Sequence, residues 1–389
     1  MRIRDLADEA VSPAEAFVNA VYMQAHRGTE LPYALTYYPA ASMNPFQRLL
    51  YSRAAANGYA VVPGLQLQDL GRVNWRDRSV IHLHWLASVL KGVESRSAAE
   101  ARIAGFRSNL ASWRAAGHRV VWSLHNVLPH DCPYPEAEVA LRRVLVEGAD
   151  AVQVLSHASV DEARRHYDLP GDKVFHVPHP SYEGWYANVD EREASRLELD
   201  LPGGAFTFAF FGSLQPYKGV LDLIDAFRTL RAREHSRPLR LVIAGKPIDA
   251  GYADEIRGRI GDDTDILFIP SAMEERQVQV VFNAADVVVA PYRRTLNSGV
   301  ALLASTFRKP LVAPAGGGLL ETFADDTTLL YGPDQESGLV DAMERAFTHV
   351  PSPEVFDRLL ERHSPHHVSD AFFHSLTQRL FDQGACDEH

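Results

Sequence analysis

A glycine and a lysine mark the ends of one loop, Gly212–Gly219 (GSLQPYKG), which lies between an apolar run and an amphipathic segment. Gly212 allows the backbone to turn sharply and to approach a ligand closely. The helix expected after the loop offers free N–H groups and the positive end of its dipole, and Lys218 adds a mobile cation. We therefore predict a diphosphate site that includes Gly212, Ser213 and Lys218, and we expect Lys218 to be catalytic as well. A glycine turn beside a solvated lysine is the alternative.

A second loop, Pro291–Gly299 (PYRRTLNSG), has the same position between an apolar run and a helical pattern. Asn297 or Ser298 is suited to cap the helix, and Gly299 lets its first turn approach a ligand. The two arginines are able to bind phosphate bidentately, although one of them pairing with an acidic neighbour is equally open. The ligand contacts that we expect from this loop are Arg293, Arg294, Thr295, Asn297, Ser298 and Gly299.

Two further glycine-containing loops follow apolar runs. Gly245 and Lys246 begin one of them, and we predict that they form the edge of a pocket for a nucleotide base. Three consecutive glycines, Gly316–Gly318, lie in the other and leave room for a ligand or a neighbouring domain. The chain lacks GxxxxGK[ST], and no GxGxxG follows its first apolar run, so the common phosphate-binding fingerprints are absent.

Histidines follow three apolar runs in the first half of the chain. In a parallel sheet the ends of such runs converge on one edge, and a histidine or carboxylate with a pKa near neutrality acts there as a general base. We predict His125 as the first candidate for this base and Asp131 as the second. His82 is interpreted as a strand residue. We call the substrate that gives up its proton to this base the acceptor. The other residues that we expect to contact it are His84, Trp85, Asn126, His130 and His179.

Metal binding is the alternative use of these histidines. His125, His130 and Asp131 would supply the ligands, but neither HExxH nor another tight ligand spacing is present. We therefore expect no metal and no cofactor.

The elements that carry these loops follow a strand–helix alternation. The apolar runs are rich in Val, Ile, Phe and Tyr and mostly lack polar alternation, which is typical of parallel strands buried on both faces. The intervening segments have helical spacing, so βαβ units are predicted. The expected strands are Tyr33–Tyr38, Gly58–Val62, Val80–Trp85, Arg119–Leu124, Ala151–Leu155, Val174–Val177, Phe206–Phe211, Leu239–Ala244, Ile266–Ile269, Val287–Ala290, Leu311–Ala313 and Thr328–Tyr331.

Two series of strands in 389 residues predict two α/β domains. We place the first, which carries the acceptor site, at 1–186 and the second, which carries the nucleotide site, at 190–365. The polar stretch Val189–Gly204 is the predicted junction, because Pro202 and its two following glycines interrupt regular structure. The apolar spacing within residues 366–383 predicts a last helix that packs back on the first domain.

The overall composition excludes several classes of protein. A net charge of −11 disfavours nucleic acid as a partner, and the two cysteines provide no disulfide framework. No apolar leader opens the sequence, and no apolar run is long enough to span a bilayer. We expect a cytoplasmic protein. The arginines between 228 and 240 leave peripheral contact with the inner face of a membrane open, with a solvated helix face as the alternative.

The order of these motifs resembles the C-terminal half of GT-B glycosyltransferases, most closely the large family four. The matching segments are Gly212-x-Leu-x3-Lys218-Gly, Ala244-Gly245, NAADVVVAPY (283–292) and KPLVAPxGG (309–317). The resemblance implies two Rossmann-like domains that face each other across a cleft. It also implies a nucleoside-diphosphate sugar as donor, metal independence, and a lipid-linked, glycan or small-molecule acceptor.

Two departures from the family pattern stand out. The usual Glu-x7-Glu carboxylates fall at Thr295 and Leu303, and an arginine that often follows the first glycine is Ser213. In this respect the chain is similar to bacterial exopolysaccharide and β-mannosyltransferase-like enzymes. We expect transfer of a GDP- or UDP-linked hexose, with inversion slightly favoured over retention. The alternatives are a GT-B-shaped sugar-nucleotide epimerase and a non-catalytic protein that binds a sugar nucleotide.

Overall fold

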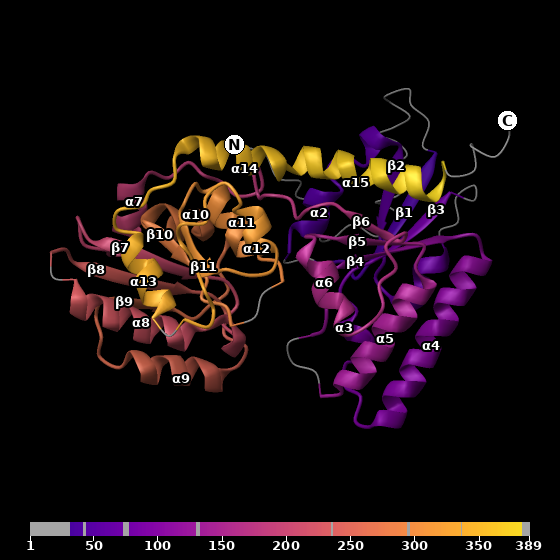
Figure 1. Ribbon diagram of the computed structural model, residues 1–389, viewed down its shortest axis with the longest axis horizontal. Helices are drawn as coiled ribbons and strands as arrows, with labels where there is room; N and C mark the ends of the chain where they lie inside the picture. The colour runs from indigo at the N-terminus through magenta and orange to yellow at the C-terminus, as the bar shows by residue number, and fades with distance from the viewer. Residues whose placement is uncertain are drawn as a thin grey trace. The chain divides into compact units, whose positions relative to one another are not determined.

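The computed structural model describes residues 32–41, 44–72, 78–129, 133–234, 236–293, 296–335 and 337–382. The chain divides into two compact units (Figure 1). The N-terminal unit ends at Pro180 and takes up the chain again at His363, and the C-terminal unit spans Ser181–Arg362. The change of unit at Pro180 thus comes before the junction that we expected at 189–204.

The N-terminal unit contains a six-stranded sheet of order β2-β1-β3-β4-β5-β6, and its pairings are all parallel. The helices α2 and α15 pack on one face of this sheet, and α4 and α5 lie on the other (Figure 1). The strands are β1 (Tyr33–Tyr38), β2 (Tyr59–Pro63), β3 (Ser79–Leu83), β4 (Arg119–Leu124), β5 (Ala151–Val154) and β6 (Val174–His176). The helices are α2 (Phe46–Leu50), η1 (Ala55–Asn57), η2 (Leu67–Arg72), α3 (Ala87–Leu90), α4 (Arg96–Ala115), α5 (Pro135–Gly148), α6 (Ala158–Arg164) and α15 (Pro365–Leu380).

The C-terminal unit contains a second six-stranded parallel sheet, of order β12-β11-β10-β7-β8-β9. Its strands are β7 (Phe206–Phe211), β8 (Leu239–Ala244), β9 (Ile266–Ile269), β10 (Val287–Val289), β11 (Leu311–Pro314) and β12 (Leu330–Tyr331). Its helices are α7 (Arg192–Glu198), η3 (Pro216–Lys218), α8 (Val220–Arg233), α9 (Ala250–Ile260), α10 (Glu275–Ala284), α11 (Gly299–Thr306), α12 (Gly318–Thr322), α13 (Gly338–Arg345) and α14 (Pro353–Arg362). Each predicted strand is therefore present, with ends that differ by a few residues.

The strand order places a topological switch point in each sheet. In the C-terminal unit the order reverses between β7 and β10, so the loops after these two strands diverge and leave space for a ligand. In the N-terminal unit the corresponding switch lies between β1 and β3. The loops after β7, β10 and β3 are the loops in which the sequence analysis placed most of the candidate residues.

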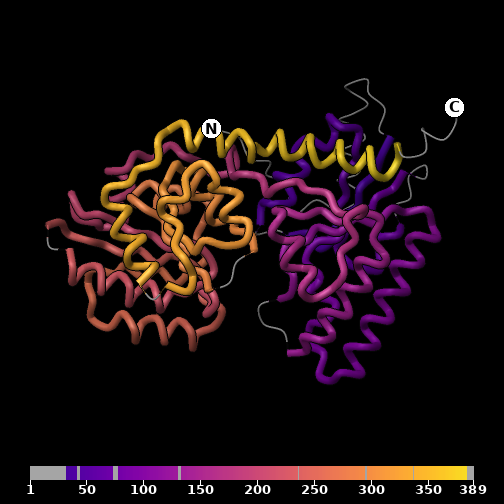
Figure 2. The backbone as a smooth tube through the Cα atoms, viewed as in Figure 1, coloured from indigo at the N-terminus to yellow at the C-terminus, as the bar shows by residue number. Residues whose placement is uncertain are grey.

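The last helix belongs to the N-terminal unit. Its side chains Phe372, Phe373, Leu376 and Leu380 are buried against the strand residues of this unit and against α2. Figure 2 shows α15, at the yellow end of the chain, beside the indigo segment of α2. The helical spacing of apolar residues in this segment is explained by this packing.

The stretch 189–204 is not a free linker, because it contains α7, which packs against α10 in the C-terminal unit. Arg196 of α7 is 6% exposed. Its guanidinium donates hydrogen bonds to the hydroxyl of Thr207 and to the carbonyls of Ala284, Pro202 and Ala205. The local sequence does not distinguish a buried, hydrogen-bonded arginine from an exposed one. For this reason the polar composition of the stretch predicted a junction here.

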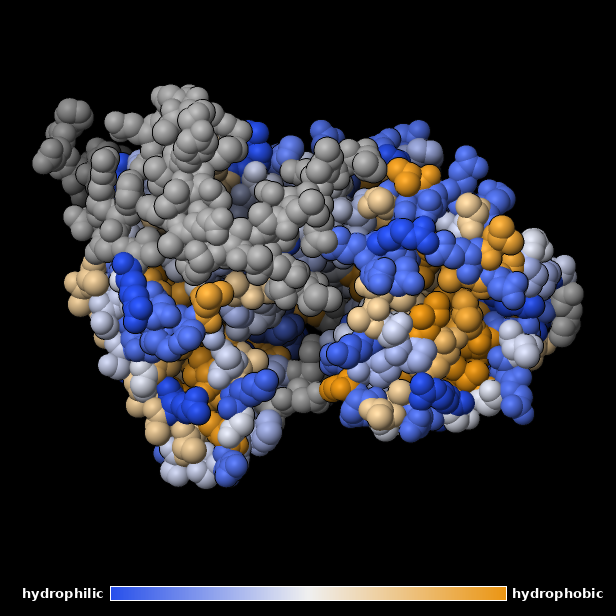
Figure 3. All heavy atoms as spheres, turned by 180° about the vertical axis from the view of Figure 1, so that it is seen from behind, coloured by the Kyte–Doolittle hydropathy of each residue, from blue (hydrophilic) through white to orange (hydrophobic). Residues whose placement is uncertain are grey.

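The surface arginines between 228 and 240 are paired with acidic groups. Asp263 accepts from Arg228 and Arg231, and Asp265 accepts from Arg231 and Arg240. This pairing balances their charge and gives no support to a basic membrane-binding patch. Hydrophilic and apolar residues are mixed on the face drawn in Figure 3. Across the described residues, none of the helices combines the length and apolarity needed to cross a bilayer.

Candidate functional site

The loops after β7 and β8 are joined along their backbones in the C-terminal unit. Leu214 N–H donates to the carbonyl of Lys246 over 2.8 Å, and Ile248 N–H donates to the carbonyl of Leu214 over 2.9 Å. Gly245 has a φ of +155°, and a Cβ atom added to it would lie 1.7 Å from the carbonyl oxygen of Gly212. Gly245 is therefore needed for the close approach of the two loops, whereas Gly212 is needed for its backbone φ of +120°.

Lys218 lies at the end of the short helix η3, immediately before α8. Its Nζ atom donates a hydrogen bond to Oγ of Ser213 over 2.9 Å and lies 5.7 Å from the ring centroid of Tyr292. Gly219, at φ +70°, brings this turn against Pro291, whose carbonyl oxygen would lie 2.1 Å from an added Cβ atom. Burial lowers the pKa of Lys218 to about 8. The amine of the half-buried Lys218 is thus held at the switch point, close to Gly212.

The loop after β10 supplies a helix start and one engaged arginine. Ser298 caps α11 by accepting a hydrogen bond from the backbone of Ala301 over 3.2 Å, and Gly299 is the first residue of the helix. Arg293 is exposed and forms a bidentate pair with Asp222, at 2.8 and 2.7 Å. Of the two alternatives for this arginine, the acidic partner is the one that the structure shows.

The remaining candidates of this unit differ in what the structure describes. Asn297 is half-buried, and Lys246 is exposed. Arg294 and Thr295 lie outside the described residues. The side chains that the structure places at the switch point are accordingly those of Ser213, Lys218 and Ser298. The backbones of Gly212, Gly219 and Gly245 lie with them.

The contact between Gly245 and Gly212 leads to a testable expectation. Gly245→Ala should destabilise the C-terminal unit by about 1–3 kcal/mol, because its Cβ atom would force two packed backbones apart. Gly258→Ala is the matched control, since nothing lies within 4 Å of its added Cβ atom and Gly258 is inside α9. The control should be neutral or slightly stabilising. Urea unfolding measures the stability of both variants. Equal losses of stability in the two would contradict this account of the loop contact.

Aromatic and histidine side chains form a cluster at the carboxyl end of the N-terminal sheet. His84 Nδ1 and His125 Nε2 are 3.0 Å apart, and the Trp85 ring stacks on His125 with centroids 4.2 Å apart. Phe46 of α2 contacts both His125 and His179, with centroids 4.7 and 4.8 Å apart. The residues that follow three different strands therefore meet in one place, as the parallel sheet predicts.

The members of this cluster are buried to different degrees. His84 is 2% exposed, and both of its ring nitrogens have partners, since Nε2 lies 2.7 Å from the hydroxyl of Tyr51. It therefore supports other residues and does not itself offer a surface to an acceptor. His125, Trp85, Asn126 and His179 are half-buried. His130 and Asp131, the second candidate base, lie outside the described residues.

The histidines of the cluster are neutral near pH 7. Burial lowers the pKa of His125 well below its usual value, and the neighbouring His84 and His179 lower it further. Burial also lowers the pKa of His84, and it lowers that of His179 to about 4. His179 Nδ1–H donates to the carbonyl of Pro180 over 2.7 Å. A neutral imidazole retains a lone pair, so His125 is chemically able to accept a proton.

One groove near this cluster was not anticipated from the sequence. It lies at the carboxyl ends of β1 and β2, next to α3 and α4, and it has both polar and apolar walls. Tyr38, whose hydroxyl lies 3.2 Å from that of Ser88, is at its edge. Its walls include Leu65, Gln66, Ser88, Phe106 and Asn109. Only Tyr38 ends a predicted strand, because the helix α4 reaches this place through tertiary packing that the local sequence does not record.

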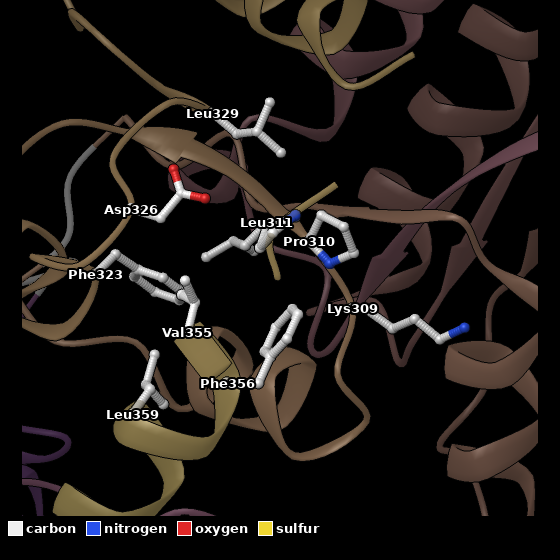
Figure 4. Close-up of a pocket in the computed structure, with 10 residues that line it drawn as sticks. Lys309, Pro310, Leu311, Phe323, Asp326, Leu329, Val355, Phe356 and Leu359 are labelled. Atoms are coloured by element: carbon white, nitrogen blue, oxygen red, sulfur yellow. The ribbon is translucent and has the colours of Figure 1, made fainter. Parts of the chain in front are cut away.

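Another hollow lies at the opposite end of the C-terminal sheet. Figure 4 shows Phe323, Val355, Phe356 and Leu359 gathered around it, with Asp326 and Lys309 at its sides. Pro310 and Leu311 place it at the start of β11, whereas ligands of parallel sheets bind beyond the carboxyl ends. We therefore do not assign it to the candidate site.

Comparison with known proteins shows what this chain is similar to. Residues 205–349 match the family model described as glycosyl transferases group 1. A D-inositol 3-phosphate glycosyltransferase of Corynebacterium efficiens is 32% identical over 204 residues, which are 51% of this chain and 48% of that protein. This chain therefore spans about half the length of that relative. A GDP-mannose:glycolipid 4-beta-D-mannosyltransferase of Xanthomonas campestris pv. campestris is 26% identical over 332 residues, covering 82% and 85% of the two chains.

Solved structures show the same fold. Sucrose-phosphate synthase from Thermosynechococcus elongatus has a TM-score of 0.65 at 17% identity, over 91% of this chain and 100% of that one. Anabaena Alr3699/HepE in complex with UDP and glucose has a TM-score of 0.59 at 14% identity, over 88% and 99%. The predicted α/β class with two Rossmann-like parallel sheets is confirmed by this agreement.

Proposed function

We propose that this chain, whose residues 205–349 form a group 1 glycosyl transferase domain in a GT-B fold, transfers a hexose from a nucleoside-diphosphate sugar to a hydroxyl group. The observation that carries the proposal is the position of Lys218. Its amine lies beside Ser213 and Gly212 at the switch point of the C-terminal sheet. A cation next to tightly turned glycine backbone is suited to a diphosphate.

The donor is proposed to be a GDP- or UDP-linked hexose. One relative is named for GDP-mannose and a glycolipid, and one structure of the same fold holds UDP and glucose. We extend these two ligand classes to this chain because its loops after β7 and β10 offer the ammonium of Lys218 and the starts of the helices α8 and α11 to a diphosphate. The acceptor is proposed to be a hydroxyl group of a glycan, a glycolipid or a small molecule. Peripheral contact with a membrane would follow from a lipid-linked acceptor.

We propose that no metal is needed to hold the donor. The loop 212–219 contains neither Asp nor Glu, and the next carboxylate along the chain, Asp222, is occupied by Arg293. Lys218 and the backbone N–H groups at the start of α8 and α11 are then the groups that balance the charge of the diphosphate.

The proposed reaction is a displacement at the anomeric carbon of the donor sugar. The acceptor oxygen forms a bond to the anomeric carbon while the bond from that carbon to the donor phosphate breaks. His125 takes the proton of the acceptor hydroxyl, and Lys218 stabilises the negative charge that develops on the departing nucleoside diphosphate. This arrangement favours inversion at the anomeric carbon, because the base acts on the acceptor side.

Thermal unfolding with a panel of nucleoside diphosphates tests the donor site. We expect GDP or UDP to raise the melting temperature, by the usual stabilisation that a ligand gives to the folded state, and we expect EDTA not to reduce the shift. No shift with any nucleotide would remove the proposal. A shift that disappears with EDTA would remove metal independence alone. A shift without transfer to any acceptor would favour a non-catalytic binding protein. The replacement of the usual two glutamates by Thr295 and Leu303 is consistent with that alternative.

The lowered pKa of Lys218 predicts a pH dependence of binding. In the protein without nucleotide the pKa of Lys218 is about 8. The ammonium that a diphosphate requires is therefore lost as the pH rises above that value. The dissociation constant for GDP or UDP should therefore rise by up to about tenfold per pH unit between pH 8 and the pKa in the complex, and this contribution of Lys218 should vanish below pH 7. In Lys218→Arg this step should be absent, because a guanidinium does not deprotonate in this range. Calorimetric titrations at several pH values measure it, and an equally steep step in Lys218→Arg would assign the proton to another group.

A further inference from the structure

A row of hydrogen-bonded polar side chains crosses the buried face of the N-terminal sheet. His82, Ser123 and Gln153 belong to the adjacent strands β3, β4 and β5, and each of them is 0% exposed. Tyr51, which follows α2, and His84, which follows β3, continue the row and are 9% and 2% exposed. The surrounding side chains are apolar, and Phe372 of α15 stacks on His82 with centroids 5.0 Å apart.

The row is continuous from Val177, which directly follows β6, to His125. Gln153 Nε2 donates to the carbonyl of Val177 over 3.1 Å, and Gln153 Oε1 lies 2.5 Å from Oγ of Ser123. Ser123 Oγ lies 2.7 Å from His82 Nε2, and His82 Nδ1 lies 2.7 Å from the hydroxyl of Tyr51. That hydroxyl lies 2.7 Å from His84 Nε2, and His84 Nδ1 lies 3.0 Å from His125 Nε2.

The end at Val177 fixes the direction of the first bonds. A backbone carbonyl only accepts, so the amide nitrogen of Gln153 must face Val177 and its oxygen must face Ser123. Ser123 then donates its single proton to Gln153. Its oxygen is left to accept from His82, which must carry its proton on Nε2.

The same reasoning passes through the rest of the row. With the proton of His82 on Nε2, its Nδ1 accepts from the hydroxyl of Tyr51. The oxygen of Tyr51 then accepts from Nε2–H of His84, which leaves Nδ1 of His84 as an acceptor. Nε2–H of His125 donates to this atom. The reverse direction would give Ser123 two protons to donate or place two acceptors together at Val177.

We propose that Gln153, Ser123, His82, Tyr51 and His84 are positioning residues that hold His125 in a single tautomer, with its proton on Nε2 and its lone pair on Nδ1. The proposal rests on the proposed function of His125 as the base that accepts a proton from the acceptor hydroxyl. Within the part of the chain that the structure describes, Nδ1 of His125 has no hydrogen-bond partner, and His125 is the half-buried member of the row.

The row sets the tautomer and does not conduct protons. Its far end is the amide of Gln153, which has no proton to release at neutral pH and does not accept one on its nitrogen. A proton taken up at Nδ1 therefore stays on His125 until it leaves from that same atom. Burial lowers the pKa of His82 and His84 well below the usual value, which keeps both rings neutral, as the direction of the bonds requires.

The experiment compares two breaks in the row with a matched control. Tyr51→Phe removes the hydroxyl in the middle, and Gln153→Leu removes the end that sets the direction. Tyr59→Phe is the control, because the hydroxyl of Tyr59 is bonded to Thr377 in the same core and lies outside the row. The readout is the ¹⁵N NMR shift of the histidine ring nitrogens, which distinguishes a protonated from a bare nitrogen. A His125→Gln spectrum identifies the signals of His125.

We expect His125 of the unaltered protein and of Tyr59→Phe to show only the Nε2–H form. Each break should populate the Nδ1–H form of His125 to at least about half, because the two directions of the remaining hydrogen bonds then have nearly equal free energies. In a transfer assay kcat should then fall about twofold or more, in parallel with the loss of the Nε2–H form, with the KM for the donor unchanged. Folding of each variant is checked by its thermal unfolding, and either variant alone carries the test.

An Nδ1–H form in the unaltered protein, or an unchanged single tautomer in a folded variant, would overturn the proposal. The NMR arm needs no turnover, so it is independent of the proposed function. A single Nε2–H tautomer that becomes mixed in the variants, in a protein without transferase activity, would uphold the positioning role and remove the base function instead.

Discussion

Lys218→Ala is expected to weaken the binding of GDP or UDP by about ten- to a hundredfold, because a hydrogen-bonded charge contact with phosphate is worth about 1.5–3 kcal/mol. The effect on transfer should be larger, about a hundred- to a thousandfold in kcat/KM. The ammonium acts most strongly on the charge that develops on the departing diphosphate, and it does so at a partly buried site. Titration calorimetry and initial rates measure the two losses separately.

Lys309→Ala provides a matched control for the loss of a buried lysine. Burial also lowers the pKa of Lys309 to about 8, but its amine donates to the carbonyls of Asn283 and Ala285 at the amino ends of the strands. Its replacement should lower the melting temperature and leave the nucleotide affinity unchanged. Equal losses of affinity in the two variants would mean that Lys218 acts through stability and not through contact with the phosphate.

The fold could be predicted from the sequence because its signal is local. Parallel strands covered on both faces appear as apolar runs, as in Phe206–Phe211 and Leu239–Ala244, and both strands have the predicted bounds. The rule that ligands bind beyond the carboxyl ends of such strands then selected the loops with Lys218, Ser298 and His125. No partner had to be known for these steps, since spacing along the chain carried the information.

The parts that could not be predicted depend on contacts between distant segments. Arg293 has an acidic partner in α8, and Arg196 is buried although it belongs to the stretch that we predicted to be a junction. Gln153 lies inside an apolar strand, and nothing in the neighbouring residues indicates that it anchors a row of hydrogen bonds. One sequence signal for this row does exist. It is the spacing of two residues between His82 and His84 and between Ser123 and His125. Side chains at this spacing share a face of a sheet, so polar pairs there predict a polar line across it.

His125→Gln is the second replacement with a large expected effect. Removing a general base usually costs about a hundred- to ten-thousandfold, and we expect kcat to fall in that range while the dissociation constant for the nucleotide stays the same. Glutamine retains an amide N–H that can donate to Nδ1 of His84, so the buried row keeps its partner. His374→Gln, an exposed position on α15 in the same unit, is the matched control and should leave the rate unchanged.

The pH profile separates a base from a merely structural histidine. Because burial lowers the pKa of His125 well below its usual value, the ring stays neutral as the pH falls from 8 to 6.5 and should reach its protonated, inactive form only at lower pH. The loss of ammonium at Lys218 should reduce kcat/KM above a pH of about 8. In His125→Gln the acid limb should disappear, whereas the alkaline limb should remain, because it belongs to another residue. An acid limb that persists in the variant would assign the base to a different group.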